Sequence, residues 1–418
     1  MDFLSFLNNS ITPYHAIKNS VNMLLEQGFQ ELTFQKIWHL EPSKSYFIKQ
    51  GPTTVFAFRM PQKISTKLRF KLAMAHSDFP TLKVTPRSTF YKSGVQLVHS
   101  EVYGSPLYHS WLDRDLGCAG LLVYEKDGQM QNRLVQSLKK FNIPQLAVHL
   151  QRNVNQEGIK VDPQKGLDVF WSSNQEDSLE SWLQQELAPG EDLLDYDIQF
   201  FDAQPASYGG VNEEWIYSGR LDNLASCHAA IKALLKSVPA PDSICGACLF
   251  NHEEIGSETR EGARGPFLKA VLAQILESLQ LPNINLAGIL ENSFAISMDM
   301  AHALHPSYPE KHDIRHAPSL GGGVVLKQNA QKRYATDVFS SATFKRLCRN
   351  AGVSFQDFVS RNDMPCGSTI GPSIAASLGI PTVDVGEPML SMHSIREMSA
   401  SKDHLEMILL IVALFKEI

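Results

Sequence analysis

Histidines and carboxylates recur in five short segments of this chain, at the ends of stretches typical of buried strands or in the adjoining loops. The segments contain His76 with Asp78, Asp222, Glu253 with Glu254, Asp299, and His393. Zinc accepts imidazole nitrogens and carboxylate oxygens as ligands, and a catalytic zinc site keeps one position open for water. Two ions that share one carboxylate need two further ligands each, so five side chains can hold a pair. These residues therefore form a candidate metal set.

Glu253 and Glu254 are the most informative pair within that set. Adjacent carboxylates repel each other, and neighbouring residues of an extended chain point in opposite directions. One of the two can therefore bind metal while the other faces a bound water. The apolar run over 247–250 predicts that they follow a buried strand, whereas a solvated acidic turn is the alternative.

The elements that must position these residues alternate between strand and helix. The pattern predicts helices over 17–27, 221–237, 265–279, 340–350, 369–378 and 401–416, and strands over 45–58, 68–75, 244–250, 295–299, near 354 and over 382–385. Alternation on this scale predicts an α/β fold in which helices cover a mostly parallel sheet. Ligands of such sheets gather beyond the carboxyl ends of the strands, which is where the candidate metal set falls.

A different texture fills the stretch from about 86 to 205. Segments such as 94–102 and 145–151 alternate apolar and polar residues and are broken by Gly, Asn and Pro, which is typical of half-exposed strands. A chain of 418 residues is long enough for two domains. We therefore predict a catalytic domain formed by 1–87 and 205–418, interrupted by an inserted β-rich domain over 88–204.

Composition excludes several classes of partner. A net charge of -6 without a basic stripe argues against nucleic acid. The longest apolar run, 407–415, is far shorter than the ~20 residues of a membrane span, and the N-terminal stretch lacks the pattern of a secretory signal. Six scattered cysteines suit a reducing compartment, so we expect a cytoplasmic protein that acts on peptides or small molecules. The pair Cys245 and Cys248 lies in an apolar run typical of a buried strand, which favours small core residues over a zinc or redox pair.

Seven motifs in order along the chain resemble those of the aspartyl aminopeptidases. They are His76–Asp78, Gly219–Leu224, His252–Ser257, Met298–Pro306, Lys327 with Arg333–Ala335, Met364–Pro372 and Met392–Met398. The match spans nearly the whole chain. Phe79 and Gly265 depart from the family pattern, and neither departure removes a candidate ligand.

The resemblance implies a dizinc α/β catalytic domain with an inserted β-rich dimerisation domain, and a homodimer that assembles into a homododecamer. It also implies roles for the candidate metal set: His76 and Asp299 on one Zn²⁺, Glu254 and His393 on the other, and Asp222 as the bridge. The Asp222–Asn223 peptide bond is implied to be cis.

Glu253 is the general base in this assignment. The metals acidify a shared water and polarise the scissile carbonyl, while Glu253 takes the proton and passes it to the leaving amine. Asp78 is expected to hydrogen-bond the His76 imidazole and fix its tautomer, although an ordinary turn aspartate is the alternative.

Three further residues take substrate roles by the same resemblance. Lys327 is implied to hold an acidic side chain of the substrate, with Tyr334 beside it, whereas a surface lysine at a strand end is the alternative. His149 is implied to reach from one subunit into the active site of its neighbour. The alternative is an exposed strand histidine without a functional role.

The function predicted is therefore a zinc aminopeptidase with a preference for N-terminal Asp or Glu. A dizinc aminopeptidase of broad or neutral specificity, or a related deacylase or carboxypeptidase, could use the same ligands. A shell-forming scaffold with a dead site predicts a missing ligand, and none is missing here. A zinc deaminase is disfavoured because Thr369 stands where its second cysteine belongs, and no G-x-S-x-G of a serine hydrolase occurs.

Overall fold

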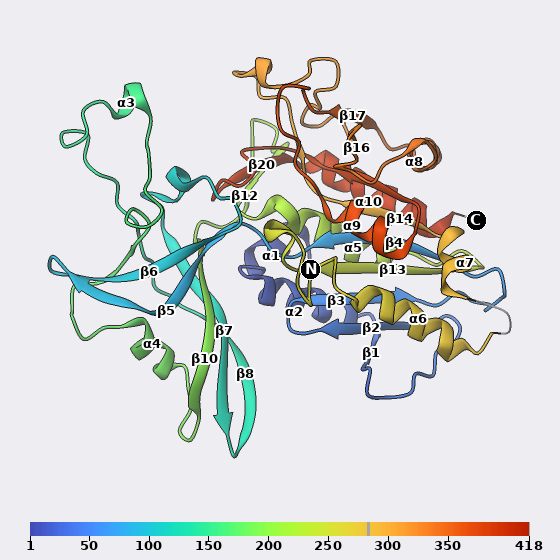
Figure 1. The fold of residues 1–418 in the computed structure, drawn as a ribbon, viewed down its shortest axis with the longest axis horizontal. Helices are drawn as coiled ribbons and strands as arrows, with labels where there is room; N and C mark the ends of the chain where they lie inside the picture. The colour runs from blue at the N-terminus through green and yellow to red at the C-terminus, as the bar shows by residue number, and fades with distance from the viewer. Residues whose placement is uncertain (282–284, 418) are drawn as a thin grey trace.

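The computed structural model describes residues 1–281 and 285–417, and they form two sheet-based bodies that lie side by side (Figure 1). The larger is an α/β body with helices on both faces of a long sheet. The smaller is a β-rich body built from the segment between β4 and β11 (Ser207–Gly209). The candidate metal set lies in the larger body.

The long sheet has nine strands within the described residues. In spatial order they are β1 (Gln30–Leu32), β2 (Ser45–Gln50), β3 (Thr54–Arg59), β13 (Ser243–Phe250), β4 (Arg69–His76), β14 (Phe294–Met298), β18 (Thr382–Gly386), β16 (Val324–Gln328) and β17 (Phe355–Val359). The central strands β13, β4, β14 and β18 are all parallel to their neighbours within that group. The antiparallel pairs β2–β3, β3–β13 and β18–β16 flank this centre. The α/β fold with a mostly parallel core is therefore confirmed.

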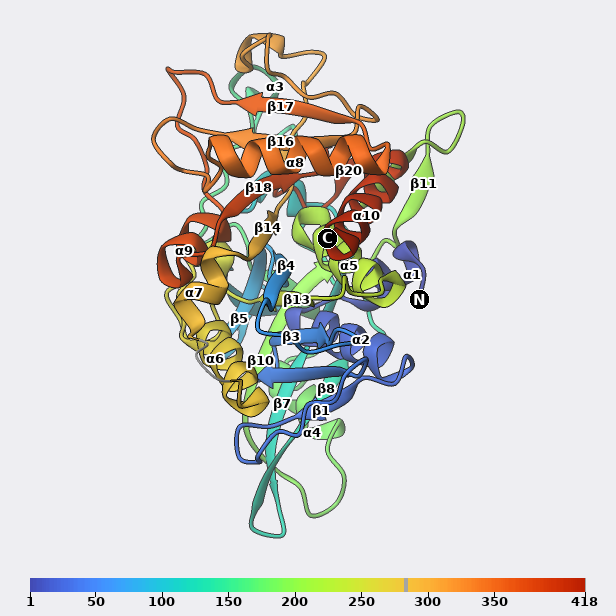
Figure 2. The same ribbon diagram turned by 90° about the vertical axis from the view of Figure 1, so that its right-hand side faces the viewer.

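Helices cover both faces of the sheet, as Figure 2 shows. One face packs against α6 (Phe267–Leu279), α7 (Leu286–Glu291) and α9 (Ile370–Leu378), and the other against α2 (Pro13–Leu25), α5 (Leu221–Lys236), α8 (Val338–Ala351) and α10 (Ser401–Lys416).

Strand β4 shows why the sheet is buried on both sides, because its side chains alternate between two apolar cores. Phe70, Leu72 and Met74 point toward α6 and α7, whereas Ala73 and Ala75 point toward α5. The small residues on the α5 side allow that helix to approach the sheet closely.

The β-rich body is an antiparallel sheet with its own core. Its strands run in the order β8 (Gln129–Gln136), β7 (Leu116–Lys126), β10 (Asp192–Asp202), β5 (Thr81–Lys92), β6 (Val95–Tyr103) and β9 (Val169–Ser172). Short helices α3 (Val154–Glu157) and α4 (Leu179–Gln185) belong to the same body. Strand β5 runs across residue 87, and the division at 87 and 204 stays a proposal.

A third, smaller sheet lies close to the candidate metal set. It joins β11 to β12 (Trp215–Ser218), β20 (Glu397–Ala400), β19 (Pro388–Leu390) and β15 (Ala301–His302). The sequence patterns did not predict it, because these strands have two to four residues and show no usable alternation.

Two predictions about individual elements need correction. The predicted strand over 145–151 is wrong: this stretch is an irregular loop with a turn at 148–150, and Leu146, Val148 and Leu150 are exposed. Within residues 1–281 and 285–417, no strand pairs with this stretch. The bounds of the first helices also differ, because the N-terminal stretch forms two helices, α1 (Phe3–Asn9) and α2, and α2 begins at Pro13, not at residue 17. The Thr12 side chain caps α2.

Candidate metal centre

Three of the candidate ligands follow neighbouring strands of the parallel core. His76 is the last residue of β4, Asp299 follows β14, and Glu253 and Glu254 lie in a short 3-10 turn after β13. Because these strands are parallel neighbours, their carboxyl ends meet at one edge of the sheet. The order of the strands thus brings a histidine and three carboxylates together.

Asp222 and His393 approach the same edge from elements outside the long sheet. Asp222 lies in the first turn of α5, and its peptide bond to Asn223 is cis, as the resemblance implied. The Asn223 side chain donates a 2.8 Å hydrogen bond to the Met298 carbonyl at the end of β14. His393 lies in the turn between β19 and β20 with a left-handed φ of 66°.

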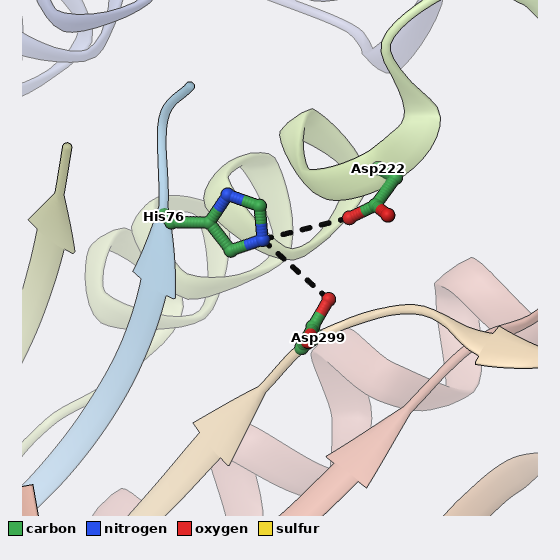
Figure 3. A group of neighbouring side chains, drawn as sticks. All are labelled: His76, Asp222 and Asp299. Carbon is green, nitrogen blue, oxygen red and sulfur yellow. Dashed lines mark ion pairs between the residues drawn. The ribbon is translucent and has the colours of Figure 1, made fainter. Parts of the chain in front are cut away.

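The five predicted ligands fall into two groups that share Asp222. His76 Nε2 lies 3.5 Å from Asp222 Oδ1 and 3.5 Å from Asp299 Oδ1, as Figure 3 shows. His393 Nε2 lies 3.4 Å from Asp222 Oδ2 and 3.4 Å from Glu254 Oε2. The two oxygens of Asp222 therefore face different histidines, which is the arrangement a bridging carboxylate needs.

The donor atoms of this cluster fit a cation. Asp222 Oδ1 and Glu254 Oε1 are buried and have no hydrogen-bond partner among the residues that the structure describes, which is costly for a carboxylate unless a positive charge compensates it. Burial alone would lower the pKa of His393, but Asp222 and Glu254 raise it to about 10. The site thus attracts positive charge, and imidazole with carboxylate is a ligand set suited to zinc.

Glu253 lies beside these two groups of ligands but is not a member of either group. Its carboxylate comes close to His76 and Glu254, so these three also form a possible metal group. Burial raises the pKa of Glu253 to about 8, with His76 opposing and Asp299 and Asp78 adding to the rise. Glu253 is thus a partly buried carboxylate next to the predicted metal ligands, where a general base has to lie.

Asp78 holds the turn that carries both glutamates. Its carboxylate accepts 3.1 Å hydrogen bonds from the backbone N–H groups of Glu253 and Glu254, and a 2.7 Å bond from the Tyr103 hydroxyl. The expected contact with the His76 imidazole differs in detail. His76 Nδ1 lies 3.1 Å from the backbone carbonyl of Asp78 and 3.4 Å from its carboxylate. Asp78 therefore links one histidine to the Glu253 turn.

Glu397 holds the other side of the cluster, and we did not single it out from the sequence. Its carboxylate is fully buried and accepts hydrogen bonds from the backbone N–H groups of Asp222, at 3.2 Å, and His393, at 2.8 Å. The signal was available, because Glu397 lies four residues after His393 in one of the quoted motifs. Each buried carboxylate thus fixes the backbone of two residues of the site.

A cavity of about 620 Å³ opens onto the cluster and is lined by Lys327 and Tyr334. Lys327 is a buried residue of β16, and its Nζ lies 3.6 Å from Asp299 Oδ2 and 5.5 Å from the centre of the Tyr334 ring. That separation from Asp299 is longer than a hydrogen bond, so the ammonium keeps donors for a further partner. The alternative of a surface lysine is wrong. His302 lines the same cavity.

His149 does not reach the cluster within its own chain. It lies in the exposed turn of the 145–151 loop, outside the residues that line the cavity. The structure therefore groups the predicted metal ligands with Glu253, Asp78, Lys327 and Tyr334, and leaves His149 apart.

Comparison with known proteins decides the family. Residues 6–415 match the family model described as "Aminopeptidase I zinc metalloprotease (M18)". The chain belongs to the M18 family of zinc aminopeptidases. It is therefore a metalloaminopeptidase, and the donor set described above fits the zinc chemistry of its family.

Relatives of this M18 aminopeptidase cover nearly its whole length. It is 38% identical to a protein of Ricinus communis named "Probable aspartyl aminopeptidase", with 96% of this chain and 92% of the relative covered. A "Probable M18 family aminopeptidase 2" of Streptomyces coelicolor is 39% identical, with 96% and 94% covered. The whole chain, including the β-rich body, is thus common to the family.

Solved structures share its fold. The structure titled "Cryo-EM structure of the Ape4 and Nbr1 complex" contains a chain that is 35% identical, with a TM-score of 0.93, covering 99% of this chain and 84% of that one. A structure titled as the dodecamer of mApe1 from S. cerevisiae is 26% identical, with a TM-score of 0.85 and coverage of 99% and 95%. No helix among residues 1–281 and 285–417 has the length and apolar character needed to cross a membrane.

Proposed function

We propose that this M18 aminopeptidase removes the N-terminal residue of peptides with two Zn²⁺ ions per subunit. The proposal depends on the orientation of the Asp222 carboxylate, because its two oxygens face two different histidines. They lie 3.5 and 3.4 Å from the imidazoles of His76 and His393. His76 and Asp299 would hold one ion, Glu254 and His393 would hold the other, and the Asp222 carboxylate would be shared between the two groups. When bound, the ions acidify a water and polarise the scissile carbonyl.

The residues of the chain supply the proton transfers and the alignment. Glu253 accepts the proton of the attacking water and returns it to the leaving amine. Asp78 and Glu397 hold the backbone on opposite sides of the site, so the ligands and the base stay aligned without movement during the reaction.

Lys327 gives the proposal its substrate preference. Its ammonium is buried in the wall of the cavity, and a carboxylate from an N-terminal Asp or Glu can pair with it in surroundings partly shielded from water. The Tyr334 ring beside the ammonium restricts its position. An acidic first residue is therefore held by charge, whereas a neutral one gains nothing from this contact.

The loop that carries His149 supports a role for a second subunit. Leu146, Val148 and Leu150 are exposed on it, which is unusual for three apolar side chains within five residues. We propose that this loop packs on a second copy of the chain in a homodimer and brings His149 to the partner's cavity. Dimers of this kind assemble into a homododecamer, and one similar solved structure is titled as a dodecamer. We expect the enzyme in the cytoplasm.

The proposal is tested with peptides that begin with Asp, Glu, Leu or Ala, each with a free and with an acetylated amino terminus. Free Asp and Glu peptides should be cleaved fastest, acetylated ones should resist, and a zinc chelator should abolish activity. Equal rates on the four free peptides would leave a broad-specificity aminopeptidase. Cleavage of the blocked peptides would indicate a deacylase or carboxypeptidase, and activity that survives chelation would overturn the two-zinc mechanism.

A further inference from the structure

Two segments far apart in the sequence form one wall of the substrate cavity. The first contributes Arg333 and Tyr334 from the loop after β16, and the second contributes the residues 367–369 before α9. Neither segment is part of a sheet or helix at these positions. Their mutual position therefore depends on side-chain hydrogen bonds and on the packing of Tyr334 against Phe358 and Cys366.

The two segments are joined near the surface by exposed contacts. Arg333 Nε donates to the Cys366 carbonyl at 3.2 Å, and the Ser368 hydroxyl donates to the Arg333 carbonyl at 3.1 Å. Exposed contacts of this kind compete with water and contribute little rigidity. Apolar packing of Tyr334 leaves the direction of the neighbouring backbone to other contacts.

Asp384 supplies a deeper connection. Its carboxylate is completely buried on β18, and Oδ2 accepts a 2.6 Å hydrogen bond from the Ala335 backbone N–H, while Oδ1 accepts a 2.7 Å bond from the Thr369 hydroxyl. The backbone N–H of Asp384 in turn donates to the Thr336 hydroxyl at 3.0 Å. One residue thus binds both segments of the wall, and it holds the peptide group that directly follows Tyr334.

Two glycines leave room for this arrangement. A methyl group added at Gly371 in α9 would overlap the Asp384 carboxylate. A methyl group at Gly386, two residues further along β18, would overlap the Asp299 carbonyl and press on the Lys327 side chain. Strand β18 therefore sets the position of the wall on one side and of Lys327 on the other.

We propose that Asp384 is a positioning residue for substrate recognition: it holds the wall that carries Tyr334 and Thr369 in place, so that Lys327 and Tyr334 form one preorganised site for the first side chain of the peptide. This inference rests on the proposed function of the cavity. Asp384 is not placed to touch the substrate itself. Its effect should therefore appear as weaker substrate binding with the chemistry intact.

The test is steady-state kinetics on peptides beginning with Asp and Leu, combined with zinc content and hydrogen exchange at the amides of 334–337. Asp384→Ala should raise KM for the Asp peptide about tenfold, change kcat less than about twofold, keep the zinc of the wild type and speed exchange at Ala335. Asp384→Asn keeps one acceptor oxygen and should recover most of the loss. Gly371→Ala keeps the carboxylate but displaces it, and should raise KM while its α9 helix gains propensity.

Asp403→Ala is the matched control. Asp403 is also a fully buried carboxylate that accepts two hydrogen bonds, from Gly321 and Gly323, and none of the three lines the cavity. This variant should lose thermal stability as Asp384→Ala does, but keep the wild-type KM. An unchanged KM in Asp384→Ala and Gly371→Ala, or an equal rise in Asp403→Ala, would overturn the inference. If the wild type fails to prefer Asp over Leu, the acidic preference is wrong, and Asp384 is still judged by exchange at Ala335 and by KM for the better substrate.

Discussion

The Asp78 carboxylate connects the metal ligand His76 to the base Glu253. Replacing Asp78 by Asn tests how much this connection contributes to activity. The asparagine side chain has nearly the same shape but offers one acceptor oxygen in place of two. The N–H groups of Glu253 and Glu254 each need an acceptor at this point, and both now use Asp78 at 3.1 Å. In the variant, one of these donors must face an amide NH₂ group.

The magnitude follows from that mismatch. A buried donor left without its partner costs about 1–3 kcal/mol, and loss of the negative charge 3.4 Å from His76 Nδ1 weakens an outer contact of the kind worth about 10–100-fold in metal affinity. We therefore expect kcat/KM of Asp78→Asn at saturating zinc to fall on the order of 100-fold, which corresponds to about 3 kcal/mol. Zinc affinity should fall by at least tenfold in the same variant.

The assay pairs kcat/KM on an Asp peptide with zinc titration against a competing chelator. Tyr103→Phe removes only the 2.7 Å hydroxyl donor to Asp78 and should cost about tenfold or less. Tyr14→Phe is its matched control, because the Tyr14 hydroxyl also donates a 2.7 Å bond to an aspartate, Asp197, away from the metal cluster. Wild-type kcat/KM and zinc affinity in Asp78→Asn, or equal losses in the two tyrosine variants, would refute the reasoning.

Three further predictions concern specificity, assembly and pH. Lys327→Ala should lose about 10–100-fold in kcat/KM on Asp and Glu peptides and much less on Leu and Ala peptides, and an equal loss on all four would contradict the role of its ammonium. His149→Ala and Glu253→Gln should each be nearly inactive alone. Subunits of both kinds assembled together should recover about a quarter of wild-type activity, because half of the random dimers are mixed and each mixed dimer contains one complete site out of two. No recovery on mixing would exclude a histidine supplied by the partner. Burial raises the pKa of Asp403 to about 7 from its ordinary value near 3.8. Because the pKa is higher in the folded state, the wild type loses stability as the pH rises between those values. The free energy of unfolding of Asp403→Asn should therefore fall less than that of the wild type from about pH 4 to about pH 7, and parallel curves for the two proteins would contradict the shift.

Most of the site could be predicted from the sequence, because residues of the types that bind zinc follow stretches that are typical of buried strands. His76, Asp299 and the Glu253 turn follow apolar runs, and a parallel sheet places such strand ends together. Asp222 and His393 come from outside this sheet, and their assignment depended on the resemblance to a known family. The resemblance also implied that Asp222 is shared, and the structure adds the distances from its two oxygens to the two histidines.

The parts that sequence reasoning missed depend on contacts without a local pattern. Asp384 acts through a hydrogen bond to a backbone group 49 residues away, and neither periodicity nor residue type marks it. Glu397 lies in one of the quoted motifs, but its hydrogen bond to the Asp222 backbone, 175 residues away, has no local pattern. The 145–151 loop alternates like a strand but pairs with no strand in the described part of its own chain. An alternating pattern shows which side chains are apolar, but it does not show what covers them. A second subunit can cover them as well as a sheet of the same chain can.

The central claim is a two-zinc centre in which Glu253 moves the proton and does not bind metal. It is tested most directly by measuring zinc per subunit and turnover of an Asp peptide in the wild type and in Glu253→Gln. Both proteins should contain two zinc ions per subunit, and the variant should lose kcat on the order of 1,000-fold or more. Fewer than two zinc ions in the wild type, loss of zinc from Glu253→Gln, or turnover that survives the substitution would contradict it.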